Sequence, residues 1–359
     1  MDIVTHGLAS LAVARGFFPR AGKAAIAAAV LAGCIADIDW LSNYFGPSAF
    51  LAWHGTYTHS ILAAILLPSI IPAILLITFL LRREIAIAMV LPKGQEAPSD
   101  ALAIVKLVSR SFLSILVIAP ICAALLHIAM DACQSRGVML LWPFSSKRFA
   151  VDWLPSIDPW ILTILIMCIA MPELLRLVSS EIGAKSKKPR GQTGALIGLA
   201  LVFVYVGARA ILHSNVLATM ESRTFHAETP RRVTAFPESL SILAWHGVVE
   251  TESALNEIEV NAFASDTFDA DSSVRLFKPD PSPALDAARN TAVARRFLAM
   301  AQIPKASLEK TEAGYVVVLR DLRYAAASET QHEIAAVIEL DPNNKVTSQE
   351  LVWARDLRH

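Results

Sequence analysis

The chain has 359 residues, of which 54% are hydrophobic and 18% are charged, and its mean hydropathy is +0.48. This composition excludes an intrinsically disordered protein and differs from that of an ordinary soluble domain. Because 32 basic residues balance 32 acidic residues, the chain has no overall positive charge with which to hold nucleic acid.

Apolar runs in the first 212 residues predict a membrane-embedded bundle of about six helical segments. Residues 61–81 form an uncharged run of 21 residues, and a helix of that length crosses a hydrocarbon core of about 30 Å. Two weaker segments before it, residues 5–18 and 23–44, are expected to form a helical hairpin. Three further runs of similar character lie at residues 112–130, 160–178 and 194–212.

After residue 212 the composition changes to that of a soluble domain. Alternating apolar and polar residues predict strands at residues 247–252, 315–322 and 334–340, and residues 283–301 are expected to form one amphipathic helix. The predicted fold class is mainly α, a polytopic membrane helical bundle with a small α+β soluble C-terminal domain. The predicted boundaries are 1–212 for the bundle and 213–359 for the soluble domain.

The distribution of Lys and Arg predicts the orientation in the membrane. With six helical passes, the basic connections at residues 15–23, 82–111 and 179–193 all fall on one side. Basic residues accumulate on the cytoplasmic side of a membrane. We therefore expect both termini, and the C-terminal domain with them, to lie outside the cytoplasm.

Histidine and aspartate residues gather at the ends of these helical segments. Such side chains are rare in membrane helices because their desolvation is costly, so each needs a partner or a function. The orientation above, which uses Lys and Arg alone, places all of these ends on the same non-cytoplasmic side. The residues are Asp2, His6, Asp37, Asp39, His54, His59, His127 and Asp131.

The residue types and their spacing favour a divalent metal centre. His127 and Asp131 are four residues apart, which lets both side chains point at one ion from one helix. Neutral imidazoles with carboxylates suit zinc, and also manganese or iron, better than calcium or magnesium. A catalytic zinc needs about three protein ligands. The eight His and Asp candidates exceed that number, which indicates either two metals or groups that orient the ligands.

Other interpretations of the same residues stay open. His127 and Asp131 are also compatible with an ion pair inside the membrane, and Asp2 with a carboxylate at the positive end of a helix dipole. A histidine at a membrane interface is commonly a hydrogen-bonded helix end. That is our interpretation of His213, His226, His246, His332 and His359.

Several short motifs follow one another in the first 212 residues. They are Met1-Asp2-x-x-Thr5-His6, Ala36-Asp37-Ile38-Asp39, His54-Gly55-Thr56-Tyr57-Thr58-His59-Ser60, His127-x-x-x-Asp131, Leu141-Trp142-Pro143-Phe144, Arg148-Phe149-Ala150-Val151-Asp152-Trp153 and Asp158-Pro159. In this order they resemble the YdjM-like family of metal-dependent hydrolases of the bacterial inner membrane. The resemblance implies a multi-pass membrane hydrolase in that membrane.

The resemblance also implies metal or catalytic roles for seven residues. We assign four as metal ligands, His6, Asp37, His59 and His127, and three to catalysis, Asp39, His54 and Asp131.

Arg148 is the candidate substrate-binding residue. Gly55 departs from the family pattern, which often has Arg there, and the Arg148 guanidinium is suited to contact a substrate phosphate in its place. The alternative is an ion pair of Arg148 with Asp152 or Asp158. Asp2, Asp152 and Asp158 are candidates to orient the metal ligands by hydrogen bonds, without binding the metal themselves.

The leading hypothesis is hydrolysis of an ester or phosphoester at the outer membrane boundary through a metal-activated water. A looser likeness of the His and Asp pattern to zinc-dependent phospholipase C favours phosphoesters. The position of the site suggests the lipid bilayer and a small-molecule or lipid-like substrate as partners. The rival hypothesis is an ion- or proton-coupled transporter, but residues 61–81 and 112–126 carry no charge across the middle of the membrane.

Overall fold

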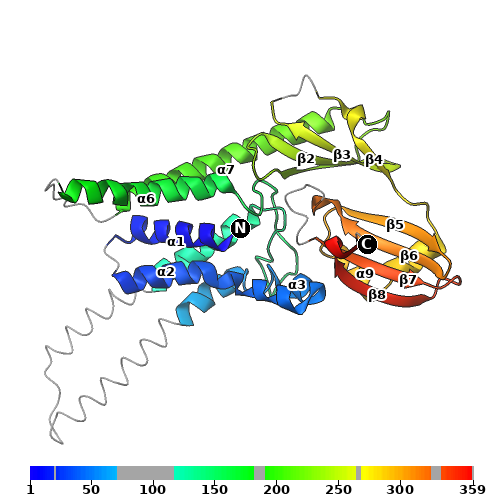
Figure 1. Cartoon of the computed structure of the whole chain (residues 1–359), viewed down its shortest axis with the longest axis horizontal. Coiled ribbons are helices and arrows are strands. Elements are labelled where there is room, and N and C mark those ends of the chain that lie inside the picture. Colours follow the sequence, from blue (N-terminus) through cyan, green and yellow to red (C-terminus); the bar gives the residue numbers. More distant parts are fainter. Residues whose placement is uncertain (20–21, 71–116, 182–190, 264–267, 325–332, 358–359) are drawn as a thin grey trace, which may run out of the picture.

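The computed structural model describes residues 1–19, 22–70, 117–181, 191–263, 268–324 and 333–357. The N-terminal half is helical and the C-terminal half is an α/β region with two four-stranded sheets (Figure 1). The predicted division into a helical half and an α/β half is therefore confirmed.

Helices occupy the predicted apolar segments as far as the described residues extend; residues 71–81 and 112–116 of the third and fourth segments lie outside them. In chain order the helices are α1 (Ile3–Phe17), α2 (Lys23–Ile35), the 3-10 helix η1 (Ala36–Phe45), α3 (Pro47–Trp53), helices at Ile61–Ile70 and Val117–Ala132, α6 (Pro159–Glu181) and α7 (Gln192–Glu221).

Two helical stretches of the described chain are long and apolar enough to cross a membrane, by length and composition. They are Ala25–Phe45, with 21 residues, and Gln192–Glu221, with 30 residues. The described apolar helices Ile3–Phe17, Ile61–Ile70, Val117–Ala132 and Pro159–Pro172 are shorter. The bundle of six spans stays a prediction.

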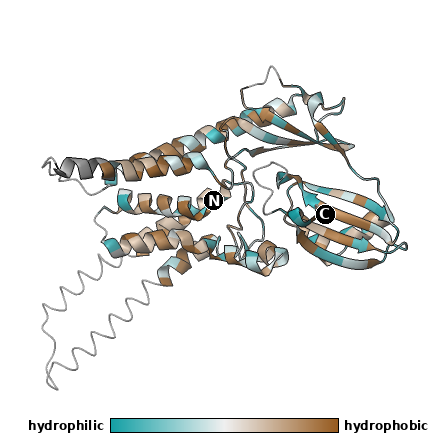
Figure 2. Ribbon diagram, viewed as in Figure 1, coloured by the Kyte–Doolittle hydropathy of each residue, from teal (hydrophilic) through white to brown (hydrophobic). Residues whose placement is uncertain are grey.

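The helical half packs around α1, which lies between α2 and the pair α6 and α7 (Figure 1). Apolar side chains cover α7 and the part of α6 up to Pro172 (Figure 2), and Phe203 and Val204 of α7 are 81% and 66% exposed. A surface of this kind suits contact with lipid, since a soluble protein rarely exposes a large contiguous apolar patch.

Helix α7 extends nine residues beyond the predicted end at residue 212. Its last turns are part of the core of the first sheet, where Val216 and Met220 pack with Phe225, Trp245 and Val249. The apolar run ends earlier than the helix because these later turns bury one stripe against the sheet and leave the other sides polar.

The two sheets are antiparallel meanders. The first contains β1 (Arg232–Pro237), β2 (Ala244–Glu250), β3 (Ala254–Asn261) and β4 (Val274–Phe277) in that order. The second contains β5 (Pro304–Thr311), β6 (Gly314–Asp321), β7 (Ile334–Leu340) and β8 (Val346–Trp353) in that order. The three predicted strands correspond to β2, β6 and β7.

The predicted single helix at residues 283–301 is wrong, because the structure has two short helices there. They are α8 (Pro283–Arg289) and α9 (Ala292–Leu298). Thr291 interrupts the run, since its backbone is extended and its hydroxyl accepts the Ala294 N–H as an N-cap. Both helices pack on the second sheet, so the apolar pattern of the sequence runs on from α8 into α9 and does not reveal that the helix is interrupted.

Helix α3 joins the helical half to the second sheet. Phe50 is 4% exposed and belongs to the core between that sheet and α8 and α9, with its ring 5.5 Å from that of Trp353. The same ring stacks on His54 at 4.6 Å. A side chain of the predicted site therefore rests directly on the residue that docks the C-terminal sheet.

Candidate metal centre

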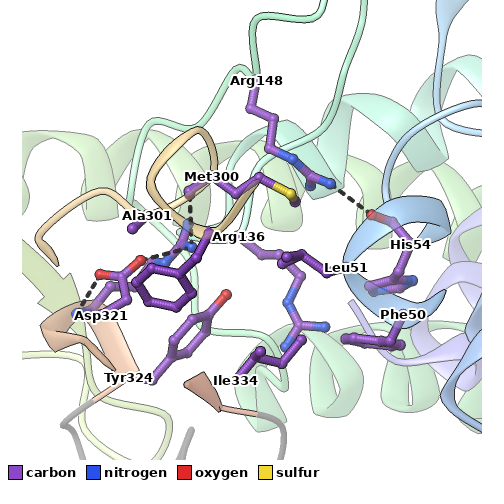
Figure 3. Close-up of a pocket in the computed structure, with 12 residues that line it drawn as sticks. Phe50, Leu51, His54, Arg136, Arg148, Met300, Ala301, Asp321, Tyr324 and Ile334 are labelled. Carbon is purple, nitrogen blue, oxygen red and sulfur yellow. Dashed lines mark hydrogen bonds and ion pairs between the residues drawn. The ribbon is translucent and has the colours of Figure 1, made fainter. Parts of the chain in front are cut away.

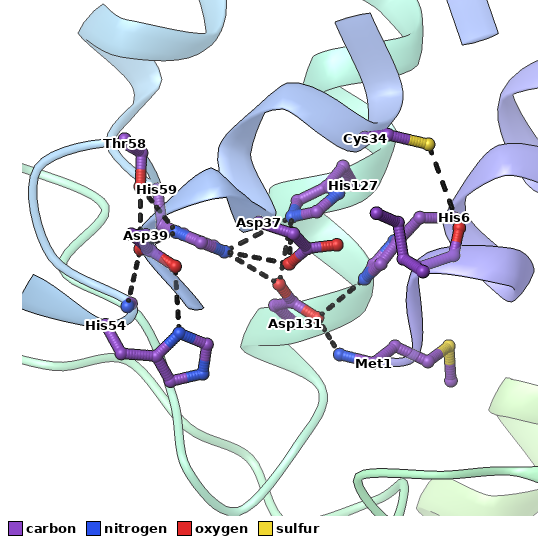
Figure 4. A network of polar contacts seen from close by, with 12 residues as sticks. Met1, His6, Cys34, Asp37, Asp39, His54, Thr58, His59, His127 and Asp131 are labelled. Carbon is purple, nitrogen blue, oxygen red and sulfur yellow. Dashed lines mark hydrogen bonds and ion pairs between the residues drawn. The ribbon is translucent and has the colours of Figure 1, made fainter. Parts of the chain in front are cut away.

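Four side chains from three separate helical stretches meet beside Met1, just before the start of α1 (Figure 4). His6 comes from α1, Asp37 from the start of η1, and His127 and Asp131 from the helix Val117–Ala132. One ligand atom of each lies within 4.8 Å of the others. The sequence predicted this convergence, although it assigned Asp131 to catalysis.

Asp131 is the centre of the cluster and is 6% exposed. Its Oδ1 is 3.1 Å from His6 Nε2 and accepts hydrogen bonds from the Met1 ammonium group at 2.5 Å and the Gln134 amide at 3.0 Å. Its Oδ2 is 3.1 Å from His127 Nε2 and 3.2 Å from His59 Nε2. Oδ2 is therefore the oxygen that faces the remaining imidazoles.

The backbone fixes the tautomer of His127. Its Nδ1 is 2.6 Å from the carbonyl oxygen of Gly33, and a carbonyl can only accept, so Nδ1 carries the proton. In the neutral ring Nε2 then presents a lone pair, 3.1 Å from Asp131 Oδ2 and 3.6 Å from Asp37 Oδ1. A hydrogen bond on the far nitrogen is the usual way in which proteins orient a metal-binding histidine.

His59 is held in the same way by a carboxylate. Its Nδ1 is 3.0 Å from Asp39 Oδ2, while its Nε2 faces the cluster at 3.2 Å from His127 Nε2 and 3.7 Å from Asp37 Oδ1. Nitrogens of two imidazoles and oxygens of two carboxylates thus converge. Such a set suits a cation, and the buried Asp37 Oδ2 has no hydrogen-bond partner among the described residues.

Asp39 lies beside the cluster and joins it to the turn after α3. Its Oδ1 is 2.8 Å from His54 Nδ1, and its Oδ2 accepts the Gly55 N–H at 3.0 Å and the Thr58 hydroxyl at 2.7 Å. The rings of His54 and His59 are 6.0 Å apart. Burial lowers the pKa of His54 to about 4, although its hydrogen bond to Asp39 acts in the opposite direction.

In the described structure the side chains of the three candidate orienting residues bond groups other than the cluster. Asp2 caps α1, accepting the N–H groups of Val4 and Thr5 at 3.1 and 2.9 Å. Asp158 caps α6, where its Oδ1 accepts two backbone N–H groups and its Oδ2 accepts the Tyr205 hydroxyl at 2.9 Å. The alternative role of Asp2 at a helix terminus is the one that its contacts match.

Asp152 and Arg148 lie in the connection between the helix Val117–Ala132 and α6. Burial raises the pKa of Asp152 to about 6, and its Oδ1 has no hydrogen-bond partner among the described residues. Arg148 donates to the carbonyl oxygens of Gly137 at 3.1 Å and His54 at 2.8 Å. Its recorded contacts in the described chain include no ion pair with Asp152 or Asp158.

The contacts of several other residues in the site could not be predicted from the sequence. Gly33 provides the carbonyl for His127 and also the close approach of α2 to α1, since a Cβ there would lie 1.7 Å from the Ser10 hydroxyl oxygen. Thr58 and Gln134 each bond a carboxylate of the network. A neutral glycine, threonine or glutamine is too common beside a helix for its position alone to predict these contacts.

Comparison with known protein families gives a match over the helical half of the chain. A family model described as the YdjM inner membrane protein matches residues 1–216. The chain belongs to the YdjM family. The resemblance seen in the motifs is thereby confirmed, and the chain is one of a family of inner membrane proteins. The match covers every residue of the cluster.

The second sheet has a relative of its own. Residues 283–358 match the YfhP C-terminal alpha/beta plait domain, a region that contains α8, α9 and β5 to β8. No curated protein and no solved structure matches the chain.

Proposed function

We propose that the chain is a membrane-bound metal-dependent hydrolase that acts on an ester or phosphoester at the outer face of the inner membrane. The observation that carries this proposal is the orientation of His59 and His127. Both direct Nε2 at Asp131 while Asp39 or a backbone carbonyl holds Nδ1. A simple structural ion pair would not need two imidazoles held in this way.

The donor set fits a divalent transition metal. Imidazole nitrogens and carboxylate oxygens are typical zinc ligands, and manganese and iron accept the same atoms. His6, Asp37, His127 and Asp131 would hold the ion, with His59 close enough to join them. Bound there, the metal supplies Lewis acidity to the reacting group.

His54 and Asp39 provide a proton acceptor next to the cluster. Burial lowers the pKa of His54 to about 4, so the ring is neutral near pH 7 but a weak base, and the hydrogen bond to Asp39 opposes this shift. Its Nδ1 donates to Asp39 at 2.8 Å, which leaves Nε2 free to accept a proton. Asp39 thus orients both His54 and His59, and it connects the proton acceptor to the ligand set.

A lipid-like substrate is supported by an apolar pocket that reaches Asp39. Its lining includes Asp39, Thr58 and the exposed side chains of Leu41, Phe45 and Trp53. These three side chains are 52%, 81% and 57% exposed, which is unusual for large apolar groups that water would surround. An acyl chain in this pocket would place its polar end beside Asp39.

We further propose six helical passes, with both termini and the C-terminal domain outside the cytoplasm. The cluster, η1 and α3 then lie at the outer boundary of the membrane. The basic residues on which this orientation mainly depends, at 82–111 and 182–190, fall outside the described residues, so the sequence argument stands alone.

The proposal is tested by turnover of chromogenic carboxylic esters and phosphodiesters in proteoliposomes. We expect hydrolysis that chelation removes and zinc or manganese restores, and that the His54→Ala variant lacks while it retains its metal. The transporter hypothesis predicts the opposite, a flux of metal or protons across the same vesicles with no hydrolysis. That second result would contradict the proposed function.

A further inference from the structure

A second cavity lies between the helical half and the second sheet, and His54 is part of its wall (Figure 3). Its helical wall includes Phe50 and His54, and its wall from the C-terminal domain includes Met300 and Tyr324. The cavity has a volume of about 40 Å³. That is room for a few water molecules or for one small anion.

Three arginines line this cavity, and one of them is already neutralised. Arg323 is 3.0 Å from the buried carboxylate of Asp321 and donates to the Ser135 carbonyl oxygen at 2.9 Å. Asp321 is the only acidic residue among the lining residues of the described chain. It also accepts the backbone N–H groups of Gln302 and Ile303, so the Asp321 carboxylate is already fully bonded within the chain and does not neutralise the other two arginines.

Arg136 has no such partner. Its guanidinium lies between two rings, 5.3 Å from the centre of Phe50 and 5.8 Å from that of Tyr324 (Figure 3). Its Nε is buried without a hydrogen-bond partner among the described residues, and no carboxylate is recorded beside it there. The rings fix the guanidinium in place without neutralising it.

Arg148 is the second arginine of the cavity that no carboxylate of the described chain bonds directly. Its two terminal nitrogens donate to backbone carbonyls, which are neutral, and its Nε is also buried without a partner in the described chain. Burial lowers the pKa of Arg148 to about 10. The charges of Arg323 and Arg136 act in the same direction, while Tyr324 and the Asp39 carboxylate act against it. A Cβ on Gly55 would lie 2.9 Å from Nη1, so glycine there makes room for this arginine.

Arg136 and Arg148 are half-buried cations, so partial removal from water disfavours each ion and the two also repel one another. One dianion would offset both. A phosphate monoester carries about −1.5 to −2 charges at pH 7, whereas a carboxylate carries only one. Guanidinium groups also match the geometry of phosphate oxygens.

We propose that this cavity is a phosphate-binding site, in which Arg136 and Arg148 hold a phosphate or phosphate monoester group between the helical half and the C-terminal domain. The site is separate from the metal cluster and borders it through His54. That the bound phosphate belongs to the substrate rests on the proposed hydrolase function. The binding itself does not, since it depends only on the arginines of the cavity.

The test is calorimetric titration of inorganic phosphate into the full-length protein in detergent, with acetate titrated for comparison. We expect saturable binding of phosphate that exceeds that of acetate, and a loss of about tenfold or more in phosphate affinity in Arg136→Gln. The matched control is Arg231→Gln, whose side chain is 57% exposed and paired with Glu252, and which should bind as the wild type does. No saturable phosphate binding by the wild type would overturn the proposal whether or not any variant folds.

A metal-centre variant separates this site from the proposed hydrolase function. His127→Ala should lose metal and keep its phosphate affinity, while Arg136→Gln should keep metal and lose phosphate. If phosphate affinity instead follows metal content and ignores Arg136, the anion belongs to the metal centre and the cavity proposal is wrong. Wild-type protein that binds phosphate but holds no metal would contradict the hydrolase function and leave the cavity proposal standing.

The same titration identifies the source of the phosphate. Protein in nanodiscs of phosphatidylcholine is compared with protein in nanodiscs that contain phosphatidic acid. A lipid headgroup in the cavity should reduce the affinity for inorganic phosphate in the second preparation, and a soluble phosphate ligand should bind equally in both. Either result, together with loss of binding in Arg136→Gln, supports the site.

Discussion

Gly33 shows how one residue without a functional group sets the geometry of the candidate metal centre. Its ideal Cβ would lie 1.7 Å from the Oγ and 2.7 Å from the Cβ of Ser10, so the Ser10 side chain of α1 occupies the space that a side chain at Gly33 of α2 would need. This close approach brings His6 and Asp37 to one place, and the Gly33 carbonyl oxygen receives the proton of His127 Nδ1.

We expect Gly33→Ala to reduce both metal content and thermal stability. The added methyl group forces α1 and α2 apart and moves the carbonyl away from His127, while overpacking of a tight site costs about 1–3 kcal/mol. Metal analysis and a melting curve measure the two effects. Gly22→Ala is the control, because a Cβ at Gly22 meets nothing within 4 Å.

A compensating change makes the Gly33 prediction specific. In the double variant Ser10→Gly with Gly33→Ala, the atoms that collide with the new Cβ are gone, so metal content should recover relative to Gly33→Ala alone. Unchanged metal content in Gly33→Ala itself would contradict the role assigned to the close approach.

Asp152 predicts a pH dependence of stability. Burial raises its pKa from 3.8 to about 6, so the folded state binds the proton more tightly than the unfolded state does. The favourable contribution of this group is complete below pH 3.8 and is lost as the pH rises through about 6. At most about 3 kcal/mol is involved, since one pKa unit corresponds to about 1.4 kcal/mol.

Asp152→Asn should flatten this part of the profile. Asparagine keeps the shape of the side chain and tolerates the left-handed backbone conformation, for which φ is 58°. Between pH 4 and 7 the unfolding midpoint of the wild type should fall relative to that of the variant. Parallel profiles for the two proteins across this range would show that Asp152 does not titrate there.

At the scale of elements, α3 couples the YdjM helices to the second sheet through Phe50. We expect Phe50→Ala to destabilise the docked C-terminal domain, because loss of a buried phenylalanine costs about 3–5 kcal/mol. Limited proteolysis followed by mass spectrometry should show faster cleavage of the C-terminal domain. Phe144→Ala is the control, since Phe144 is 89% exposed. Equal cleavage of both variants would mean that α3 does not hold the sheet.

Sequence patterns predicted elements well where one periodicity covers the whole element. The segments of α1, α2 and α6 have uniform apolar character, and β7 has the predicted bounds, residues 334–340. The pattern failed at residues 283–301, where both helices face the same sheet and the cap at Thr291 is a local event within one continuous stripe. It also failed at the end of α7, whose later turns pack on protein.

For the candidate site too, the sequence predicted some features and missed others. The sequence predicted that His and Asp residues at the helix ends gather, because a costly polar group at a helix end in a membrane stands out from its surroundings, and the structure brings His6, Asp37, His127 and Asp131 together. The contacts that orient each ring were not predicted, since they join segments far apart in the chain, such as Gly33 with His127. Arg136 was missed because one arginine in a loop is ordinarily solvated.

At the scale of the whole molecule, the proposed orientation puts the C-terminal domain outside the cytoplasm. Reporter fusions after His359 test it, and we expect an alkaline phosphatase to be active there and a reporter that works only in the cytoplasm to be inactive. Fusions in the basic loop at residues 82–111 should give the reverse pattern. A cytoplasmic reporter active after His359 would contradict both the topology and the outer position of the site.

The central claim is that His6, Asp37, His127 and Asp131 hold a metal ion, and elemental analysis of detergent-purified protein tests it most directly. After growth with added zinc and manganese, we predict about one or more divalent metal ions per chain, lost in His127→Ala, in Asp131→Ala and in the double variant, while all three remain inserted and folded. Breaking a structural ion pair would behave differently, with unstable single variants and a more stable double variant. Wild-type protein that is folded and still free of metal after supplementation would contradict the claim.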